Sequence, residues 1–155
     1  MKIESLSPGQ TYETGVKMGR KARPGEIIAL SGDLGCGKTV FTQGFAKGLG
    51  IREPVTSPTF TIMQIYESGR LPLCHFDVYR LSDAEEMDEI GYEDYFYGDG
   101  VSLVEWADLF PELFPEDTVF LSIRKDPARG DDYRLIEILY AGTDDLIPDE
   151  EAPEV

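Results

Sequence analysis

The sequence has few of the residues on which many classes of site and fold depend. Its two cysteines, Cys36 and Cys74, are too few for a disulfide framework and lack the spacing of a zinc site. We therefore expect reduced thiols in a cytoplasmic protein. The single histidine, His75, excludes a histidine metal cluster and is interpreted as a half-buried strand residue. No apolar run reaches the roughly 18 residues of a membrane-spanning helix, so no membrane role is predicted.

Basic residues are also scarce, with 14 Lys and Arg against 30 Asp and Glu and a net charge of -16. Such a charge argues against binding nucleic acid over a broad surface, because that binding depends on basic side chains that release counterions. A role in a nucleic-acid pathway would therefore depend on a protein partner. Between Arg80 and Arg124 there are 13 acids and no Lys or Arg. This stretch is either a solvated surface that maintains solubility or a docking face for a basic partner.

The length of 155 residues fits one domain, which we assign to residues 1–142. Residues 143–155 are acidic, contain two prolines, and are predicted to form a disordered tail. The element pattern predicts an α/β fold, a three-layer sandwich around a central, mostly parallel sheet with one antiparallel hairpin. The predicted helices are 8–22, 40–49 and 83–90; the predicted strands are 27–30, 60–66, 71–79, 101–104, 118–123 and 133–139.

The clearest functional motif is the segment from Gly32 to Thr39, in which a glycine is followed by four residues and then by Gly-Lys-Thr. An apolar strand precedes this segment and an amphipathic helix begins at its lysine, as a phosphate-binding loop requires. Lys38 would reach the β- and γ-phosphates, and the Thr39 hydroxyl would ligate Mg²⁺. The pattern predicts the fold of a P-loop NTPase. The expected nucleotide contacts are Asp33, Leu34, Gly35, Cys36, Gly37, Lys38, Thr39 and Val40.

The sequence indicates less directly which nucleotide binds and which acidic residue would help Thr39 to hold Mg²⁺. Arg124-Lys125-Asp126 does not match the Asn-Lys-x-Asp element of guanine-specific proteins, which favours ATP. Asp77 and Glu105 each end a predicted buried strand and are the two candidates for the acid. The strand before Glu105 is more uniformly apolar, which gives Glu105 a modest advantage. Either acid could instead face water at a strand end.

Two further features lie near this predicted site. Thr56, Ser57 and Thr59 follow the loop helix, where a switch loop could meet the γ-phosphate or its metal. An ordinary Ser/Thr turn is the alternative. Trp106, the only tryptophan, directly follows Glu105. Its default role is core packing, and stacking or partner contact is the other possibility.

Together these segments resemble the TsaE (YjeE) family of bacterial P-loop ATPases. The resemblance extends from about residue 5 to residue 142 and is specific as a set, whereas the phosphate loop alone would not be. Cys36 departs from the alanine that many relatives carry. The matching segments are Gly32 to Thr39, Val55 to Phe60, His75 to Leu81, Gly91 to Phe96 and Val104 to Trp106.

The resemblance implies a weak, Mg²⁺-dependent ATPase required for threonylcarbamoyladenosine modification beside the anticodon of ANN-decoding tRNAs. It also implies two protein partners, TsaD and TsaB, with ATP hydrolysis resetting their complex and tRNA contacted only through it. It assigns the second Mg²⁺ contact to Glu105 and a catalytic or water-positioning role to Asp77, and it makes Trp106 a functional neighbour of the site. Lys38 is the other catalytic residue that it implies and keeps the phosphate contact derived above. Thr11 and Arg134 correspond to positions that touch the nucleotide.

Two alternatives remain on the same fold. A small-molecule kinase usually needs a basic lid over the transferred phosphoryl group, and the stretch between Arg80 and Arg124 contains no base to supply one. A nucleotide-dependent binding switch would keep Lys38 and Thr39 but would need no efficient catalytic acid. Phosphate release with and without TsaB and TsaD distinguishes the switch from the ATPase.

Overall fold

The computed structural model describes residues 1–33 and 35–140, so Leu34 and the predicted tail at 143–155 lie outside the described residues. The elements in chain order are β1 (Lys2–Ser5), α1 (Pro8–Lys21), β2 (Ile27–Ser31), α2 (Lys38–Gly48), β3 (Met63–Tyr66), β4 (Leu73–Asp77), α3 (Glu85–Glu89), α4 (Tyr92–Phe96), β5 (Val101–Glu105), η1 (Ala107–Leu109), η2 (Pro111–Leu113), β6 (Val119–Lys125), η3 (Pro127–Arg129) and β7 (Arg134–Tyr140).

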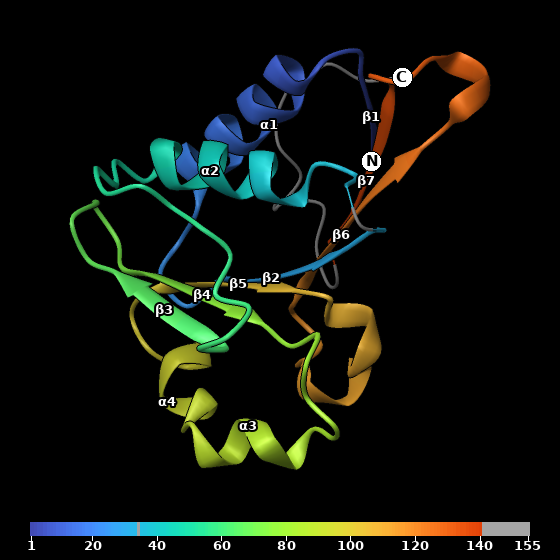
Figure 1. The fold of residues 1–155 in the computed structure, drawn as a ribbon. Coiled ribbons are helices and arrows are strands. Elements are labelled where there is room, and N and C mark those ends of the chain that lie inside the picture. Colours follow the sequence, from blue (N-terminus) through green and yellow to red (C-terminus); the bar gives the residue numbers. More distant parts are fainter. Residues whose placement is uncertain (34, 141–155) are drawn as a thin grey trace.

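One sheet with the strand order β1-β7-β6-β2-β5-β4-β3 forms the middle layer. Its centre, β6-β2-β5-β4, is parallel, whereas β3, β7 and β1 pair antiparallel at the two sides. Helices α1 and α2 cover one face, and the short helices α3 and α4 cover the other (Figure 1). The predicted three-layer α/β fold and the hairpin, which is β3–β4, are thus confirmed.

Strand β2 is buried on both faces, as its unbroken apolar run predicts. Ile28 and Leu30 join the core under α1 and α2, while Ile27 and Ala29 join the core on the α3 and α4 side. Because side chains alternate along a strand, this division places the carboxyl end of β2 between two packed layers. The phosphate loop starts from that rigid end.

Some predicted bounds differ from the structure. The strand predicted at 60–66 begins only at Met63, because Ile62 has a left-handed φ of 69° that interrupts extended backbone. The acidic helix predicted at 83–90 is confined to α3, and a separate helix, α4, follows it. Strand β1 was not predicted; four residues with only Ile3 and Ser5 facing inward give too short an alternation to recognise.

Helices α1 and α2 pack backbone against backbone through glycines. A Cβ atom at Gly15 would lie 2.3 Å from the Phe41 carbonyl oxygen, and one at Gly44 would lie 2.1 Å from the Tyr12 carbonyl oxygen. Gly19 and Gly48 make equally close approaches in the next turns of the two helices. Only glycine permits this separation, so α2 and the loop before it are held in one position on α1.

No helix among residues 1–33 and 35–140 combines the length and the apolar character needed to cross a membrane.

Candidate functional site

The loop between β2 and α2 depends on glycine at its two ends. Gly32 has φ 148°, and a Cβ there would lie 2.5 Å from the Ile123 carbonyl oxygen of neighbouring β6. Gly37 caps α2 with a left-handed φ of 108°. The helix therefore begins at Lys38, and the N–H groups of its first turn have no partners within the helix. Such a helix start favours an anionic ligand.

Arg134 holds this loop from the outside through carbonyl oxygens. Its Nε donates to the Cys36 carbonyl at 2.7 Å, and its Nη2 donates to the Gly35 carbonyl at 3.5 Å. In a trans peptide the C=O and N–H point in opposite directions, so the N–H of Gly37 points away from Arg134. Arg134 thereby fixes the orientation of one amide in the loop.

The Cys36 side chain packs inside the loop as a small apolar group. It is 1% exposed, and burial raises the pKa of its thiol despite the nearby Lys38 ammonium. A raised pKa keeps the thiol protonated near neutral pH, where a protonated thiol is a poor nucleophile. Cysteine at this position therefore preserves the packing of the loop without adding a reactive group.

A cavity of about 510 Å³ opens beside the loop and brings together most of the predicted site. Strands β2, β5 and β4 are parallel neighbours, with Leu30 opposite Glu105 and Glu105 opposite Asp77. Their carboxyl ends therefore meet next to the start of α2. The lining residues are Gly35, Gly37, Lys38, Thr39, Val40, Ser57, Thr59, Asp77, Tyr79, Glu105 and Trp106.

Glu105 ends the strand directly beside β2, and its side chain is buried together with that of His75. His75 Nε2 lies 2.6 Å from Glu105 Oε2. The prediction of a half-buried histidine was wrong, since His75 is 1% exposed. Leu73 and Leu103, two residues before His75 and Glu105, belong to the core under α1 and α2. Because residues two apart on a strand share a face, His75, Asp77 and Glu105 all project from the face that these helices cover.

Asp77 joins the predicted switch segment to the sheet. Ser57 Oγ donates to Asp77 Oδ2 at 2.9 Å, and Thr59 Oγ1 donates to the same oxygen at 3.5 Å. The other oxygen, Oδ1, accepts the backbone N–H of Tyr79 at 3.0 Å. Both oxygens of the Asp77 carboxylate thus accept hydrogen bonds from the protein.

Lys38 lies across the face of Trp106, with Nζ 3.6 Å from the ring centroid. Its ammonium group also donates to the carbonyl oxygens of Gly32 and Asp33, the latter at 3.3 Å. Trp106 has a left-handed φ of 63°, and its ring contacts Tyr79 at a centroid distance of 4.7 Å. This unusual backbone conformation turns the indole from the end of β5 back toward the loop.

A smaller cavity of about 220 Å³ adjoins the first and shares Gly35, Gly37 and Val40 with it. Thr11 and Arg134 line it, so the structure places both predicted residues beside the loop. The Thr11 hydroxyl lies 2.7 Å from Ser5 Oγ, which links the start of α1 to β1. Asp33 contributes its backbone carbonyl to the Lys38 contact but lines neither of these cavities.

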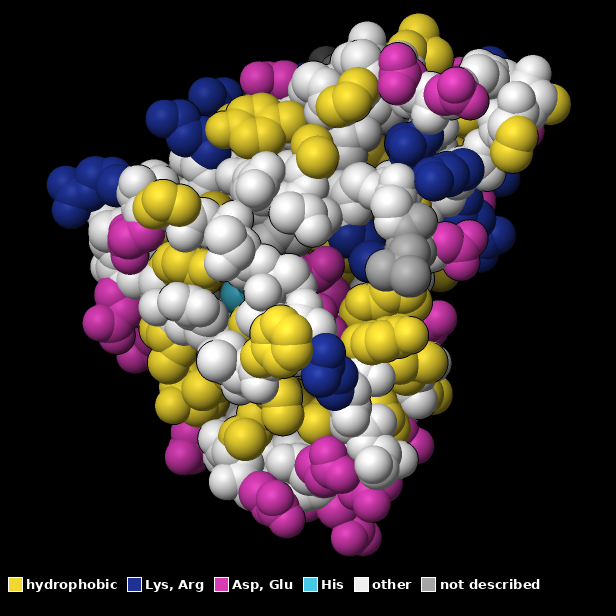
Figure 2. Space-filling view, in the orientation of Figure 1, with side chains coloured by type: hydrophobic (Ala, Val, Ile, Leu, Met, Phe, Trp, Pro, Cys, Tyr) yellow, Lys and Arg dark blue, Asp and Glu magenta, His cyan; other side chains and the backbone are white. Residues whose placement is uncertain are grey.

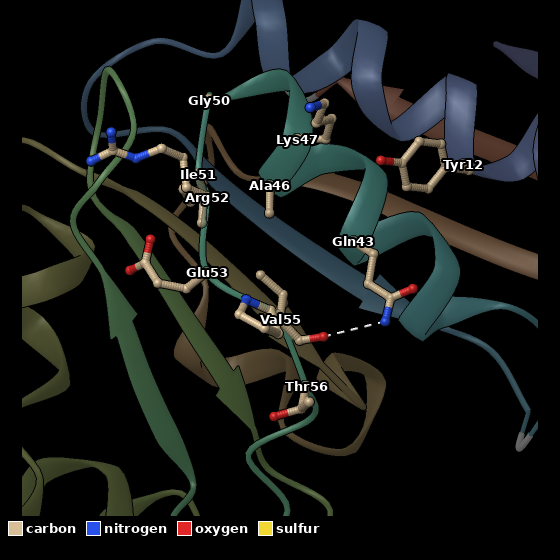
Figure 3. Close-up of a pocket in the computed structure, with 11 residues that line it drawn as sticks. Tyr12, Gln43, Ala46, Lys47, Gly50, Ile51, Arg52, Glu53, Val55 and Thr56 are labelled. Atoms are coloured by element: carbon tan, nitrogen blue, oxygen red, sulfur yellow. Dashed lines mark hydrogen bonds between the residues drawn. The ribbon is translucent and has the colours of Figure 1, made fainter.

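Thr56 is the one member of the switch segment that faces elsewhere. It lines a cavity of about 610 Å³ between the end of α2 and residues 50–56, with Tyr12, Lys47 and Arg52 (Figure 3). Within this cavity Gln43 Nε2 donates to the Val55 carbonyl at 3.3 Å. Apart from Thr56, none of the residues predicted to contact the phosphates or the metal lines this cavity, so it lies apart from the main site.

Two contributors to the site were missed from the sequence. Tyr79 lines the main cavity and its ring packs at a tilt against Trp106, and His75 pairs with Glu105. The spacing of His75 and Asp77 in a strand was a usable signal, because it places both side chains on one face. The Tyr79 contact depends on a turn after β4 that no local pattern indicated.

These contacts define the class of protein. A lysine at a helix start, a glycine loop leaving a central parallel strand, and acids ending the neighbouring strands occur together in P-loop nucleotide-binding domains. The same ligand position, at the carboxyl ends of parallel strands, is general for open α/β sheets.

The chain belongs to the TsaE family, since residues 5–135 match the family described as "Threonylcarbamoyl adenosine biosynthesis protein TsaE". It is 44% identical over 142 residues to the tRNA threonylcarbamoyladenosine biosynthesis protein TsaE of Bacillus subtilis (strain 168), covering 92% of this chain and 87% of the relative. The protein of the same name from Treponema pallidum (strain Nichols) is 44% identical over 124 residues, covering 80% and 91%.

A solved structure agrees with the fold. The crystal structure of YdiB from Bacillus subtilis matches with a TM-score of 0.78 and 41% sequence identity, covering 92% of this chain and 86% of YdiB. The predicted family and fold are therefore confirmed.

Proposed function

We propose that this chain binds ATP with Mg²⁺ and hydrolyses it slowly. The observation that carries the proposal is that Lys38, Thr39, Asp77 and Glu105 line one and the same cavity, at the carboxyl ends of parallel strands. A lysine and a helix start supply positive charge for phosphates, while two carboxylates and a hydroxyl supply oxygen atoms for a metal and a water molecule.

The two cavities beside the loop suggest how ATP would lie. The phosphates would occupy the cavity of about 510 Å³, and the adenosine would occupy the adjoining cavity of about 220 Å³. Thr11 and Arg134 line the second cavity and would stand near the base or ribose. The missing guanine element favours adenine over guanine.

The residues of the main cavity fit Mg²⁺. The Thr39 hydroxyl and the Glu105 carboxylate would hold the ion, because Mg²⁺ prefers oxygen ligands. Among the described residues no group of three or more His, Cys, Asp or Glu side chains could form a protein-only metal site. This agrees with the usual Mg²⁺ arrangement, in which one or two protein oxygens act together with phosphates and water. When bound, the ion would neutralise charge on the phosphates.

Asp77 and Lys38 would carry the catalytic roles. Lys38 would stabilise charge on the phosphate oxygens, and Asp77 would orient the attacking water. Ser57 and Thr59 donate to Asp77, so any movement of the switch segment toward a phosphate would change the hydrogen bonds of that carboxylate. We assign Trp106 the role of packing against Lys38, which supports the shape of the phosphate site.

The relatives' names place them in tRNA threonylcarbamoyladenosine biosynthesis, and we extend that role to this chain. It would serve ANN-decoding tRNAs by an ATP-driven resetting of the TsaD and TsaB complex, contacting tRNA only through those subunits. The charge of -16 supports this indirect route. Acidic side chains gather at the α3 end of the molecule and form a candidate docking face for a basic partner surface (Figure 2).

Phosphate release tests the proposal most directly. We expect slow release from ATP by the chain alone, dependent on Mg²⁺, and faster release when TsaB and TsaD are added. Tight ATP-dependent binding to the partners without hydrolysis under any condition would support the binding switch instead. Phosphate transferred to a small molecule would support the kinase.

The metal role of Glu105 has its own test. Glu105→Ala should reduce Mg²⁺-dependent hydrolysis by about 10- to 100-fold or more, as for the loss of other metal-site residues, while the circular dichroism spectrum stays unchanged. Full activity in this variant would assign the metal contact to Asp77.

A further inference from the structure

His75 and Glu105 form a buried pair behind the main cavity. Their side chains are 1% and 4% exposed, and His75 Nε2 lies 2.6 Å from Glu105 Oε2. The two residues come from adjacent parallel strands, β4 and β5, whose register aligns Leu103 with His75. His75 does not line the main cavity, whereas Glu105 does. The histidine therefore lies on the side of the carboxylate away from the nucleotide site.

The contacts of the ring indicate how the proton is placed. An ionised carboxylate only accepts hydrogen bonds, so His75 Nε2 carries the hydrogen and donates it to Glu105. His75 Nδ1 is buried and has no hydrogen-bond partner among the described residues. A hydrogen on Nδ1 would leave a buried donor unpaired, at a greater cost than an unpaired lone pair. The hydrogen bonds of the pair are therefore satisfied best with the hydrogen on Nε2.

This hydrogen bond restricts how Glu105 can act. A glutamate side chain has several rotatable bonds. Fixing it in one orientation costs conformational entropy, and this cost weakens the binding of any ligand that requires that orientation. His75 holds Oε2, and the other oxygen takes no hydrogen bond from the described residues. One oxygen is thus committed to the protein, and one remains for a metal ion or a metal-bound water. Metal-ligating carboxylates are commonly held in this way by a neighbouring donor.

We infer that His75 is a positioning residue that holds the Glu105 carboxylate in the orientation needed to bind Mg²⁺ at the nucleotide. It acts through Glu105 and touches neither the nucleotide nor the metal. This inference rests on the proposed function, because it requires Glu105 to be the magnesium-side acid.

Two variants separate positioning from mere packing. His75→Leu fills the same buried space and removes the donor. His75→Gln keeps an N–H donor at nearly the same distance from the backbone as Nε2. A purely structural role would lower thermal stability in either variant without changing the response to Mg²⁺.

The measurement is the affinity for a fluorescent ATP analogue, titrated first in EDTA and then over a range of Mg²⁺ concentrations. His75→Leu should raise the Mg²⁺ concentration for half-maximal enhancement of affinity by about 10- to 100-fold, the usual effect of removing a partner of a metal ligand. His75→Gln should stay close to the parent protein. Affinity in EDTA should be the same for all three, since the loop and Lys38 supply that binding.

A Glu105→Gln variant and the double variant with His75→Leu complete the design. The effect of His75→Leu should disappear in the Glu105→Gln background, because the two residues act as one unit. If Glu105→Gln shifts the Mg²⁺ response and His75→Leu does not, the inference about His75 is wrong and the proposed function stands. If Glu105→Gln itself causes no shift, the metal role of Glu105 fails. Should His75→Leu not fold, His75→Asn, whose amide is too short to reach Glu105, replaces it.

Discussion

The two halves of the candidate site are held in different ways. The phosphate-loop half comprises the described loop residues 32, 33 and 35–37 and helix α2, and its backbone is held by contacts with β6, α1 and the Arg134 side chain. The carboxylate half comprises Asp77 and Glu105, whose side chains are held mainly by hydrogen bonds from the side chains of Ser57, Thr59 and His75, with one further bond from the Tyr79 backbone N–H. Changes in the first half should therefore affect binding and folding, and changes in the second should affect hydrolysis and the metal.

The largest expected effect is the loss of ATP binding in Lys38→Ala. Hydrogen bonds from a charged donor contribute about 1.5–3 kcal/mol each, so removing the ammonium group should weaken binding by about 100-fold or more. Isothermal titration calorimetry with ATP and Mg²⁺ measures the change.

Lys47→Ala is the matched control, because Lys47 is an exposed lysine on the same helix and lies outside the main cavity. Its affinity should equal that of the parent protein. Unchanged affinity in Lys38→Ala would remove the assignment of the phosphate loop and, with it, the division between the two halves.

The backbone packing beneath the phosphate-loop half gives the next largest effect. In Gly44→Ala the new methyl group would lie 2.1 Å from the Tyr12 carbonyl oxygen, so α1 and α2 must separate. Overpacking of this kind typically costs about 1–3 kcal/mol, and because the methyl group meets rigid backbone of α1 at Tyr12, the cost should reach about 3 kcal/mol. Urea unfolding followed by circular dichroism measures the free energy of unfolding.

Gly9→Ala serves as the control for this substitution. Gly9 lies on α1, is exposed, and has only the Ser7 hydroxyl near the position of its Cβ, at 3.7 Å. The added methyl should leave the free energy of unfolding unchanged or raise it slightly, because alanine favours helix more than glycine. Equal stability in both variants would show that the helices can separate without loss.

The two halves also differ in how far the sequence predicts them. The phosphate loop is contiguous, so Lys38 and Thr39 are placed by a strand, a glycine pattern and a helix start that lie within a few residues of one another. Glycines 15 and 19 lie in α1 and glycines 44 and 48 lie in α2, but their role as close-packing positions appears only when the two helices are packed together. The local sequence pattern therefore predicts the phosphate loop, but it does not predict the helix packing that holds the loop in place.

The carboxylate half depends on contacts between distant residues. The apolar strand before Glu105 favoured it as the neighbour of β2, and the sheet order confirms that placement. The bond between Ser57 and Asp77 joins residues 20 positions apart, and that between His75 and Glu105 joins residues 30 apart. Such pairs follow from strand order and register, which short-range periodicity does not specify. The switch role of Thr56, Ser57 and Thr59 stays a prediction.

The smallest expected effect comes from Ser57→Ala in the carboxylate half. Ser57 is exposed, and its bond to Asp77 Oδ2 should contribute about 1 kcal/mol to holding that carboxylate, which corresponds to about a fivefold change. We expect the rate of ATP hydrolysis to fall by about this factor while the affinity for ATP remains unchanged. Thr61→Ala, an exposed residue between the switch segment and β3 that does not line the main cavity, should leave the rate unaltered. Steady-state phosphate release at saturating ATP measures both rates. A faster rate in Ser57→Ala would mean that Ser57 restrains Asp77, and a weaker affinity would place the switch segment with the phosphate-loop half.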